Sequence, residues 1–191
     1  MYNIYLGHAD TSAPTPLDYI FSVDAIIIHP DYDPKTVTND IALIRVEGII
    51  DPEGTHCKVR CICDPEPVDQ LDIEHCRALG WGITGPGTGA SKQLLEVPLP
   101  ILEDAVCAGF YQSYSQQPLV CAGNVTGQNV CSGDSGGPLV CPVKDLPDTY
   151  SLAGIASFVL HGCGEGSKPG YFTRVHHYLD WIEVQTGEKS G

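Results

Sequence analysis

The sequence predicts an all-β protein, and three observations support this prediction. The apolar segments are short and are bounded by glycine, proline, asparagine and aspartate, the residues that form turns. The chain of 191 residues contains 21 glycines and 15 prolines. Apolar residues at helical spacing stand out only near the C-terminus. Such strands are typical of a β-sandwich or a β-barrel, and the chain can form one large unit or two small ones that share a cleft.

The expected strands follow the short apolar segments in chain order. They are YNIYLG (2–7), FSVDAIIIHP (21–30), DIALIRV (40–46), CRALGWG (76–82), QLLEVPLPIL (93–102), GGPLVC (136–141), YSLAGIASFVL (150–160) and PGYFTRV (169–175). Residues 63–75 are acidic and contain prolines, so this stretch is the best candidate for a linker. A helix is expected at residues 175–187, where apolar residues recur at i, i+3, i+4 and i+7 and Gly187 provides a stop.

Charge and composition limit the function classes. The 24 acidic and 10 basic residues give a formal charge of −14, which disfavours binding to nucleic acid or to an anionic membrane. The sequence contains no apolar stretch long enough to span a membrane. It begins without a basic segment followed by an apolar one, so a secreted form would need a signal upstream of Met1.

Nine cysteines and a single methionine indicate a protein that matures in an oxidising compartment. The alternative is a cytosolic protein with reduced, buried thiols. We favour secretion, because a chain so rich in glycine and proline gains more from cross-links. The sequence NVT at Asn124 matches a glycosylation site, a short pattern that adds little weight.

The stretch SGDSGGPLVC, residues 132–141, carries the clearest sign of chemistry. A serine hydroxyl attacks a carbonyl only when a base removes its proton, and the transition state needs donors for the developing oxyanion. Gly133 and Gly136 allow a tight turn around Ser135, in which the N–H groups of Gly133 and Ser135 can point to one spot. By itself the stretch could also be a glycine-rich hairpin.

The same stretch occurs together with NDIALIRV, CRALGWG, CAG, SFV and KPGYFTRV, in this order over nearly the whole chain. This set resembles the chymotrypsin-like serine proteases of the trypsin fold, the S1 family. The resemblance implies two antiparallel β-barrels with the site between them, Ser135 as nucleophile and Asp40 orienting the base. It divides the chain into a remnant of the N-terminal barrel (1–66), a C-terminal barrel (67–174) and the helix.

The histidine that should act as base is not recognisable. In the family it lies in an AAHC-like motif before the aspartate, but only His8 and His29 precede Asp40, and neither has this context. His56 would give the chain order of the subtilisins, whose fold is parallel α/β, so we reject it. We therefore expect a truncated and inactive chain.

Asp134 carries a further expectation from the resemblance. In the family this aspartate pairs with the amino terminus created by zymogen cleavage. Here we expect an unpaired carboxylate and a relaxed oxyanion turn, because a buried, unpaired charge is costly.

The cysteines fit the same resemblance. It implies three disulfide bonds, Cys76–Cys141, Cys107–Cys121 and Cys131–Cys163. Cys57, Cys61 and Cys63 remain; Cys57 could pair with Cys61, and Cys63 with a cysteine outside this chain. A zinc site in HCKVRCIC is the weaker alternative, because no second ligand cluster lies nearby. We expect no cofactor, no metal and no calcium site.

The resemblance also indicates the specificity pocket. Asn129 and Val130 fall at its base, where a trypsin-like enzyme needs a carboxylate, so cleavage after lysine or arginine is not expected. The segment SFV (Ser157, Phe158 and Val159) resembles the elastase version of the substrate-binding strand, and Gly170 lies on the opposite wall. The same resemblance places Ser157 against Asp40. The pocket should accept small to medium apolar side chains.

Two functions therefore remain open. The first is a secreted serine endopeptidase that acts on proteins or peptides and is open to protein inhibitors. The second is a non-catalytic homologue that binds a protein through the retained cleft. An upstream segment with an AAHC-like motif would favour the first, and a replaced histidine would favour the second.

Overall fold

The computed structural model describes residues 2–13, 19–50, 59, 61–62, 65–123, 128–160, 162 and 168–187. The chain forms two compact units. The first comprises Met1–Ile62 with Lys92–Leu94, and the second comprises Cys63–Ser91 with Leu95–Gly191. The division between residues 66 and 67, which the family resemblance implies for the two barrels, stays a prediction.

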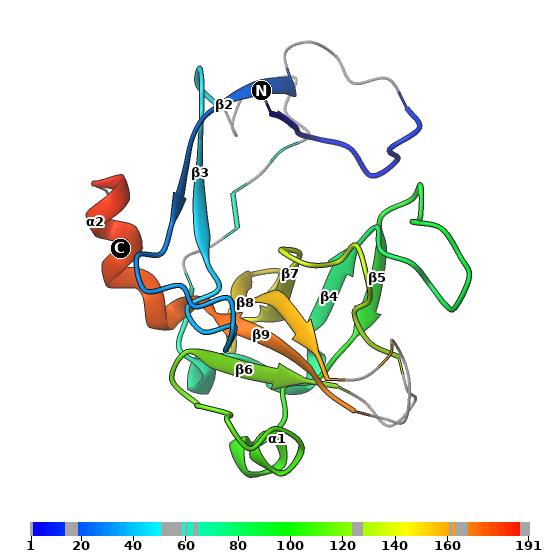
Figure 1. Cartoon of the computed structure of the whole chain (residues 1–191), viewed down its shortest axis with the longest axis vertical. Helices are drawn as coiled ribbons and strands as arrows, with labels where there is room; N and C mark the ends of the chain where they lie inside the picture. Colours follow the sequence, from blue (N-terminus) through cyan, green and yellow to red (C-terminus); the bar gives the residue numbers. More distant parts are fainter. Residues whose placement is uncertain are drawn as a thin grey trace. The chain divides into compact units, whose positions relative to one another are not determined.

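The first unit is a three-stranded antiparallel sheet in the order β1-β2-β3. The strands are β1 (Asn3–Tyr5), β2 (Ile20–Ile28) and β3 (Ala42–Val46), and Figure 1 shows β2 and β3 side by side. Alternation along β2 turns Ile26 and Ile28 to the same face, and Ile44 is the cross-strand partner of Ile26. These three side chains are exposed.

The second unit contains a six-stranded antiparallel sheet in the order β5-β4-β7-β8-β9-β6 (Figure 1). Its strands are β4 (Arg77–Gly80), β5 (Leu95–Pro98), β6 (Leu119–Ala122), β7 (Pro138–Pro142), β8 (Tyr150–Val159) and β9 (Gly170–Arg174). Shortly after β5, Ile101 forms an isolated β-bridge with Ala122 of β6, the strand at the opposite edge of the sheet. Helix α1 (Asp104–Phe110) precedes β6.

The core of the second unit includes Leu71, from the stretch 63–75 that was expected to be a linker, which corrects the prediction for the described residues 65–75. Two short 3₁₀ helices, η2 (Val68–Gln70) and η3 (Ile73–His75), flank Leu71. Leu71 is completely buried and forms a β-bridge with Val143. Its side chain packs with other buried residues of the unit, including Leu99, Leu139 and Phe172. The burial of one leucine anchors an otherwise polar segment.

The C-terminal helix is present, and its first turn is tighter than an α-helix. A 3₁₀ helix, η4 (Val175–Tyr178), leads directly into α2 (Leu179–Thr186). Val175 and Tyr178 are buried, and η4 contacts β8. Gly187 ends the helix with a left-handed φ of 75°, and its N–H donates to the carbonyl of Glu183 at 2.8 Å.

The all-β fold class with a C-terminal helix is confirmed. Both sheets are antiparallel, as expected for the trypsin fold. In the part of the chain that the structure describes, neither sheet closes into a complete barrel of strands. No helix there is long and apolar enough to cross a membrane.

Candidate active site

Ser135 lies on the surface between two consecutive tight turns. The N–H of Asp134 donates to the carbonyl of Cys131 at 2.9 Å, and the N–H of Gly137 donates to the carbonyl of Asp134 at 2.8 Å. Gly133 and Gly136 have φ of 97° and 80°, which side chains other than glycine rarely adopt. The segment therefore folds as two linked turns, and Ser135 between them is exposed.

The turns are tied to the sheet on their far side. Gly136 donates its N–H to the carbonyl of Ala156 at 2.8 Å, and Ala156 donates to Gly137 at 2.8 Å. These two bonds attach the chain after Ser135 to β8. The serine is thus exposed but held on a fixed backbone.

The N–H groups of Gly133 and Ser135 are available to a ligand. Both residues are exposed. Among the described residues, no group accepts a hydrogen bond from either N–H. Exposed donors next to a serine hydroxyl are what an oxyanion hole requires.

Asp134 is not unpaired, which corrects the expectation for its carboxylate. One carboxylate oxygen accepts the N–H of Gly82 at 2.8 Å, and the other accepts the N–H of Cys131 at 2.9 Å. Two bonds to backbone amides compensate much of the cost of removing the half-buried charge from water. The two bonds anchor the turn that carries Ser135, and the relaxation of the turn stays a prediction.

Two glycines make room for this carboxylate. A Cβ atom on Gly80 would lie 1.8 Å from an oxygen of Asp134, and one on Gly82 would lie 2.5 Å from its carboxylate. Any side chain at either position would force Asp134 to move. Beside the carboxylate lies a cavity of about 310 Å³, lined in part by Gly80, Gly82, Val97 and Asp134.

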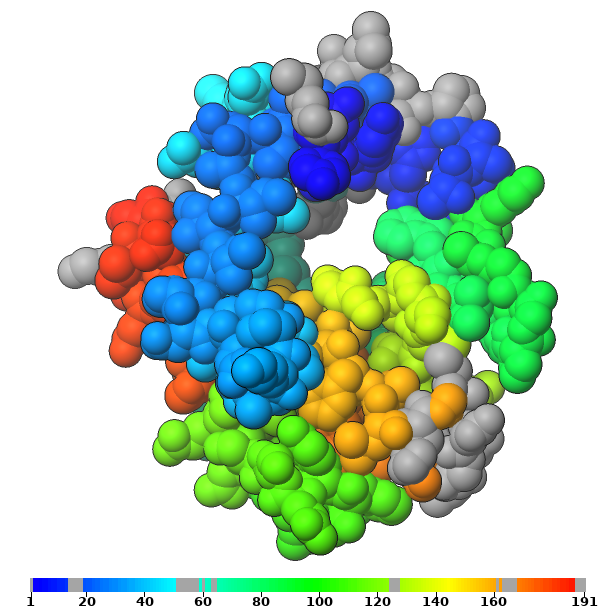
Figure 2. All heavy atoms as spheres, viewed as in Figure 1, coloured from blue at the N-terminus to red at the C-terminus, as the bar shows by residue number. Residues whose placement is uncertain are grey.

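A smaller cavity of about 120 Å³ adjoins Ser135. Figure 2 shows its two sides next to each other on the second unit, residues 128–137 in yellow-green and β8 in orange. Its lining is apolar apart from serine hydroxyls and includes Val130, Ser135, Ala156, Ser157, Phe158 and Val159. No carboxylate is among the described residues that line it.

Asn129 and Gly170 lie next to each other but do not line this smaller cavity. The Asn129 amide nitrogen donates to the carbonyl of Lys168 at 2.8 Å, and its amide oxygen accepts the N–H of Val130 at 2.8 Å. A Cβ on Gly170 would lie 2.7 Å from the same oxygen. Backbone groups thus engage both ends of the Asn129 side chain.

Asp40 belongs to the first unit and is half-buried. It follows Asn39, whose φ of 54° is left-handed and whose side-chain amide donates to the carbonyl of Asp31 at 2.9 Å. Asparagine tolerates this conformation better than most residues. The local backbone before Asp40 is therefore fixed by one side chain.

The described histidines have other partners than Ser135. In the first unit, the Nδ1 atom of His8 lies 3.2 Å from the carbonyl of Asp10, and that of His29 accepts the N–H of Asp31 at 3.3 Å. In the described part of the second unit, no hydrogen bond joins Ser135 to a histidine. The histidines there are His75, His176 and His177. His56, which we rejected as base, lies outside the described residues, as does His161.

Two of the three implied disulfide bonds are present. They are Cys76–Cys141 and Cys107–Cys121. Cys131 is also disulfide-bonded. Its implied partner Cys163 lies outside the described residues, as do Cys57, Cys63 and the Asn124 sequon.

Cys61 has a free, exposed thiol, so the suggested Cys57–Cys61 bond is wrong. The described residues contain no cluster of three or more histidine, cysteine or carboxylate side chains that could hold a metal ion.

Sequence reasoning missed the partners of the site. Gly82 emerged only as part of the CRALGWG motif, with no role assigned. Tyr171, which stacks on the pocket residue Phe158, was seen only as a strand residue. Spacing along the chain gives no signal for either contact, because both join different strands or loops.

Comparison with known proteins agrees with the fold. The family model described as Trypsin matches residues 1–182. Ovochymase from Halocynthia roretzi is 37% identical over 168 residues, which cover 85% of this chain and 10% of that protein. The CLIP domain-containing serine protease B4 from Anopheles gambiae is 34% identical over 200 aligned positions, which cover 96% of this chain and 54% of that protein. The chain thus spans about half or less of these relatives, and it belongs to the trypsin-like family of serine proteases.

Proposed function

We propose that the protein is a serine endopeptidase whose nucleophile is Ser135. The observation that supports this most strongly is the exposed serine between two left-handed glycines, with the N–H groups of Gly133 and Ser135 open to a ligand. In the reaction, the Ser135 oxygen attacks a peptide carbonyl, and the carbonyl oxygen becomes an oxyanion that accepts hydrogen bonds from these two groups. The serine proton must pass to a base, which later protonates the leaving amine.

We propose that the 191-residue chain itself lacks this base and does not hydrolyse peptides at a useful rate. Asp40 would orient the base. Loss of one member of such a triad lowers the rate by several orders of magnitude, even when the oxyanion donors remain.

Asp134 has an activation-linked role in this proposal. Its carboxylate holds the turn through the amides of Gly82 and Cys131, and the adjoining cavity of about 310 Å³ leaves room for an incoming terminal amino group. This positively charged group would add an ion pair to the two amide hydrogen bonds that hold the Asp134 carboxylate here.

The substrate pocket is proposed to be formed by Val130, Phe158 and Val159, with Asn129 and Gly170 behind it. Its apolar lining and the absence of a carboxylate among the described lining residues support a preference for small to medium apolar side chains. The engaged amide of Asn129 gives no charge to pair with lysine or arginine. The disulfide bonds support secretion.

A second candidate is a non-catalytic homologue that binds a protein through this cavity. The observation in its favour is that the cavity is formed although no described histidine of the second unit bonds to Ser135. A binding role needs the pocket but not the nucleophile.

Labelling of Ser135 by a fluorophosphonate probe tests the proposal. We expect no detectable labelling of the 191-residue chain at pH 7, and strong labelling once the chain is extended by an upstream segment with an AAHC-like motif and activated. Ser135→Ala is the control for site identity. Rapid labelling of the 191-residue chain at pH 7 would disprove the proposal that this chain lacks a base. An upstream segment in which the histidine is replaced would favour the non-catalytic binding protein.

A further inference from the structure

A second hydrophobic cluster lies behind the small cavity in the second unit. Cys107, Cys121 and Tyr171 are its fully buried members. The half-buried side chains packed against them are Leu102, Tyr111, Tyr114, Phe158 and Leu160. This cluster connects α1 and its disulfide bond with β8 and β9. It is separate from the larger core around Leu139.

Phe158 belongs to both the cluster and the cavity wall. Its ring stacks on that of Tyr171 with centroids 4.9 Å apart and planes 8° apart. Tyr111 meets both rings edge-on, with centroids 5.4 Å from each. Because these two tyrosines contact the Phe158 ring, they determine where it can lie along the cavity wall.

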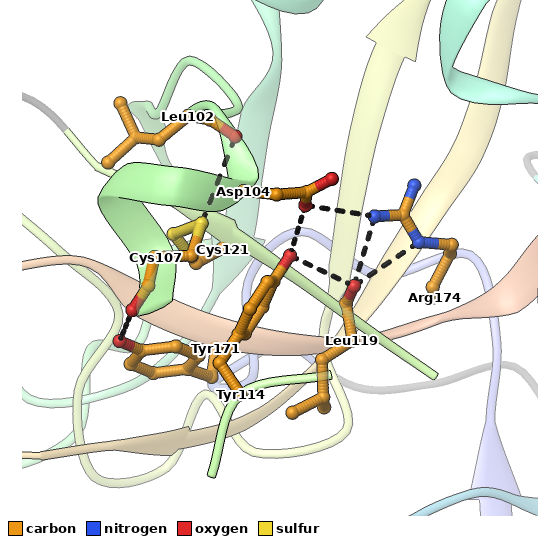
Figure 3. Close-up of a disulfide and its surroundings, with 8 residues drawn as sticks. All are labelled: Leu102, Asp104, Cys107, Tyr114, Leu119, Cys121, Tyr171 and Arg174. Atoms are coloured by element: carbon orange, nitrogen blue, oxygen red, sulfur yellow. Dashed lines mark hydrogen bonds and ion pairs between the residues drawn. A yellow bond between two sulfur atoms is a disulfide. The ribbon is translucent and has the colours of Figure 1, made fainter. Parts of the chain in front are cut away.

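Tyr171 is fixed to the disulfide. Its hydroxyl donates to the carbonyl of Cys107 at 3.0 Å, and Cys107 is bonded to Cys121 (Figure 3). The Tyr171 side chain is completely buried. A shift of its ring would therefore strain the bond to Cys107 and disturb the packing around it.

Tyr114 supports Tyr171 from another side, with ring centroids 6.2 Å apart. As Figure 3 shows, the Tyr114 hydroxyl points to Asp104 and to the carbonyl of Leu119. It donates to the Asp104 carboxylate at 2.6 Å, and the Leu119 carbonyl lies 3.3 Å away. Burial, followed by the bond to Asp104, raises the pKa of Tyr114, so the hydroxyl keeps its proton and remains a donor well into the alkaline range.

Arg174 completes the arrangement. Its Nε and Nη2 atoms donate to the Leu119 carbonyl at 3.2 and 3.0 Å, and Nη2 lies 3.8 Å from the Asp104 carboxylate. We call Asp104, Tyr114 and Arg174 the Tyr114 brace. It joins the start of α1, the loop before β6 and the end of β9.

We propose that Tyr114 is a positioning residue for the cavity wall. The brace fixes the Tyr114 ring, this ring limits the movement of Tyr171, and Tyr171 sets the position of Phe158 beside Ser135. The inference rests on the proposed function of the cavity as a pocket for an apolar side chain of a peptide. It adds that the fit of this side chain depends on hydrogen bonds made outside the pocket.

The first test observes Phe158 directly in the full chain. The protein is labelled with 4-fluorophenylalanine, and its four phenylalanines are assigned by single substitutions such as Phe158→Leu. Tyr114→Phe removes the hydroxyl but keeps the ring. We expect it to shift and broaden the Phe158 fluorine resonance and to leave that of Phe21, in the first unit, unchanged.

Two further variants complete this test. Tyr150→Phe changes an exposed tyrosine at the other end of β8 and should alter nothing. Asp104→Asn keeps an oxygen that can accept the Tyr114 hydrogen bond, so its effect should be smaller than that of Tyr114→Phe. An unchanged Phe158 resonance in Tyr114→Phe would overturn the proposal.

The second test measures binding of an acetylated tetrapeptide amide that ends in valine. We expect Tyr114→Phe to weaken its affinity about fivefold, the usual effect of one hydrogen bond, and Tyr150→Phe to leave it unchanged. A shifted Phe158 resonance with unchanged affinity would contradict the positioning role. If the unmodified chain binds no peptide, the proposed function of the cavity fails, while the fluorine spectrum still decides whether the brace positions Phe158.

Discussion

The two units of the chain differ sharply in how their residues are held. Nearly all buried apolar side chains of the described residues lie in the second unit, and Ile41 is the exception in the first. The second unit also contains the disulfides Cys76–Cys141 and Cys107–Cys121. The first exposes Ile26, Ile28 and Ile44 on its three-stranded sheet. Ser135, the proposed nucleophile, thus rests on a packed, cross-linked framework, whereas Asp40 rests on a unit with little core of its own.

This difference teaches that two residues with proposed catalytic roles, Ser135 and Asp40, need not lie in equally stable parts of one chain. Local stability follows the number of buried apolar contacts around a segment. We therefore expect amide hydrogens of β7 and β8 to exchange much more slowly than those of β2 and β3. Similar rates of amide hydrogen exchange in both units would contradict this difference in local stability.

The largest effect is expected from removing the Cys76–Cys141 disulfide. It closes a loop with a sequence separation of 65, for which loop entropy predicts a loss of about 4 kcal/mol in the free energy of unfolding. Cys107–Cys121 spans a separation of 14, so its loss should cost about 3 kcal/mol. Urea unfolding of the two double-alanine variants measures both values. The reverse order would show that loop length does not dominate.

The next largest effect is expected from Leu139→Ala. It should lower the free energy of unfolding by about 3 kcal/mol, because Leu139 is completely buried and its strand lies between β4 and β8. Ile26→Ala is the matched change in the first unit. Ile26 is 50% exposed, so Ile26→Ala should lower the free energy of unfolding by less than about 1 kcal/mol. Equal losses in urea unfolding would mean that the first unit buries this face in solution.

Gly82→Ala tests the anchor of the oxyanion turn. The added methyl group would overlap the Asp134 carboxylate, so we expect a loss of about 2 kcal/mol and a displaced turn. Gly85→Ala is the control, because a Cβ there meets nothing within 4 Å. Unfolding by urea gives the stability, and the ¹⁵N chemical shifts of Gly133 and Ser135 report the turn. Equal behaviour of the two variants would contradict the role of Gly82.

A smaller effect concerns alkaline pH. Burial, and to a lesser degree the neighbouring Tyr111, raises the pKa of Tyr171 from 10.0 to about 12. The folded state therefore holds this proton more tightly than the unfolded chain. The bound proton of Tyr171 contributes fully to the free energy of unfolding below pH 10, and this contribution is lost as the pH rises through 12. Between pH 10 and 11 the free energy of unfolding should fall by about 1 kcal/mol.

The urea midpoints at pH 9 and 11 check this prediction. Tyr171→Phe should be less sensitive to the pH change, although it loses the bond to the Cys107 carbonyl. Tyr150→Phe, which alters an exposed tyrosine, should behave as the unmodified chain does. Identical pH dependence in all three proteins would refute the assignment to Tyr171.

Local features of the site were predictable from the sequence, because they depend on a few neighbouring residues. Gly133 and Gly136 predicted a tight turn around Ser135, and both adopt the left-handed backbone conformation that such a turn requires. The helix at the C-terminus follows from its apolar stripe, and Gly187 marks its end. The pairing of Cys107 with Cys121 followed from the family resemblance.

Contacts between distant segments could not be read in the same way. Gly82 and Asp134 lie 52 residues apart, and their hydrogen bond exists only because the loop after β4 passes beside the turn. Leu71 looked like part of a linker because its neighbours are polar, yet packing places it in the core. The stack of Phe158 on Tyr171 depends on a register shift between β8 and β9 that no sequence period reveals.

The most direct test of the account is the pH dependence of fluorophosphonate labelling at Ser135. If the chain carries a nucleophile but no base, hydroxide must remove the serine proton. The labelling rate should then be undetectable at pH 7 and rise about tenfold per pH unit above it, without a plateau up to pH 9. A plateau with a midpoint near 6.5, the ordinary pKa of imidazole, would reveal a histidine base and contradict the account, as would labelling of Ser135→Ala at the same rate.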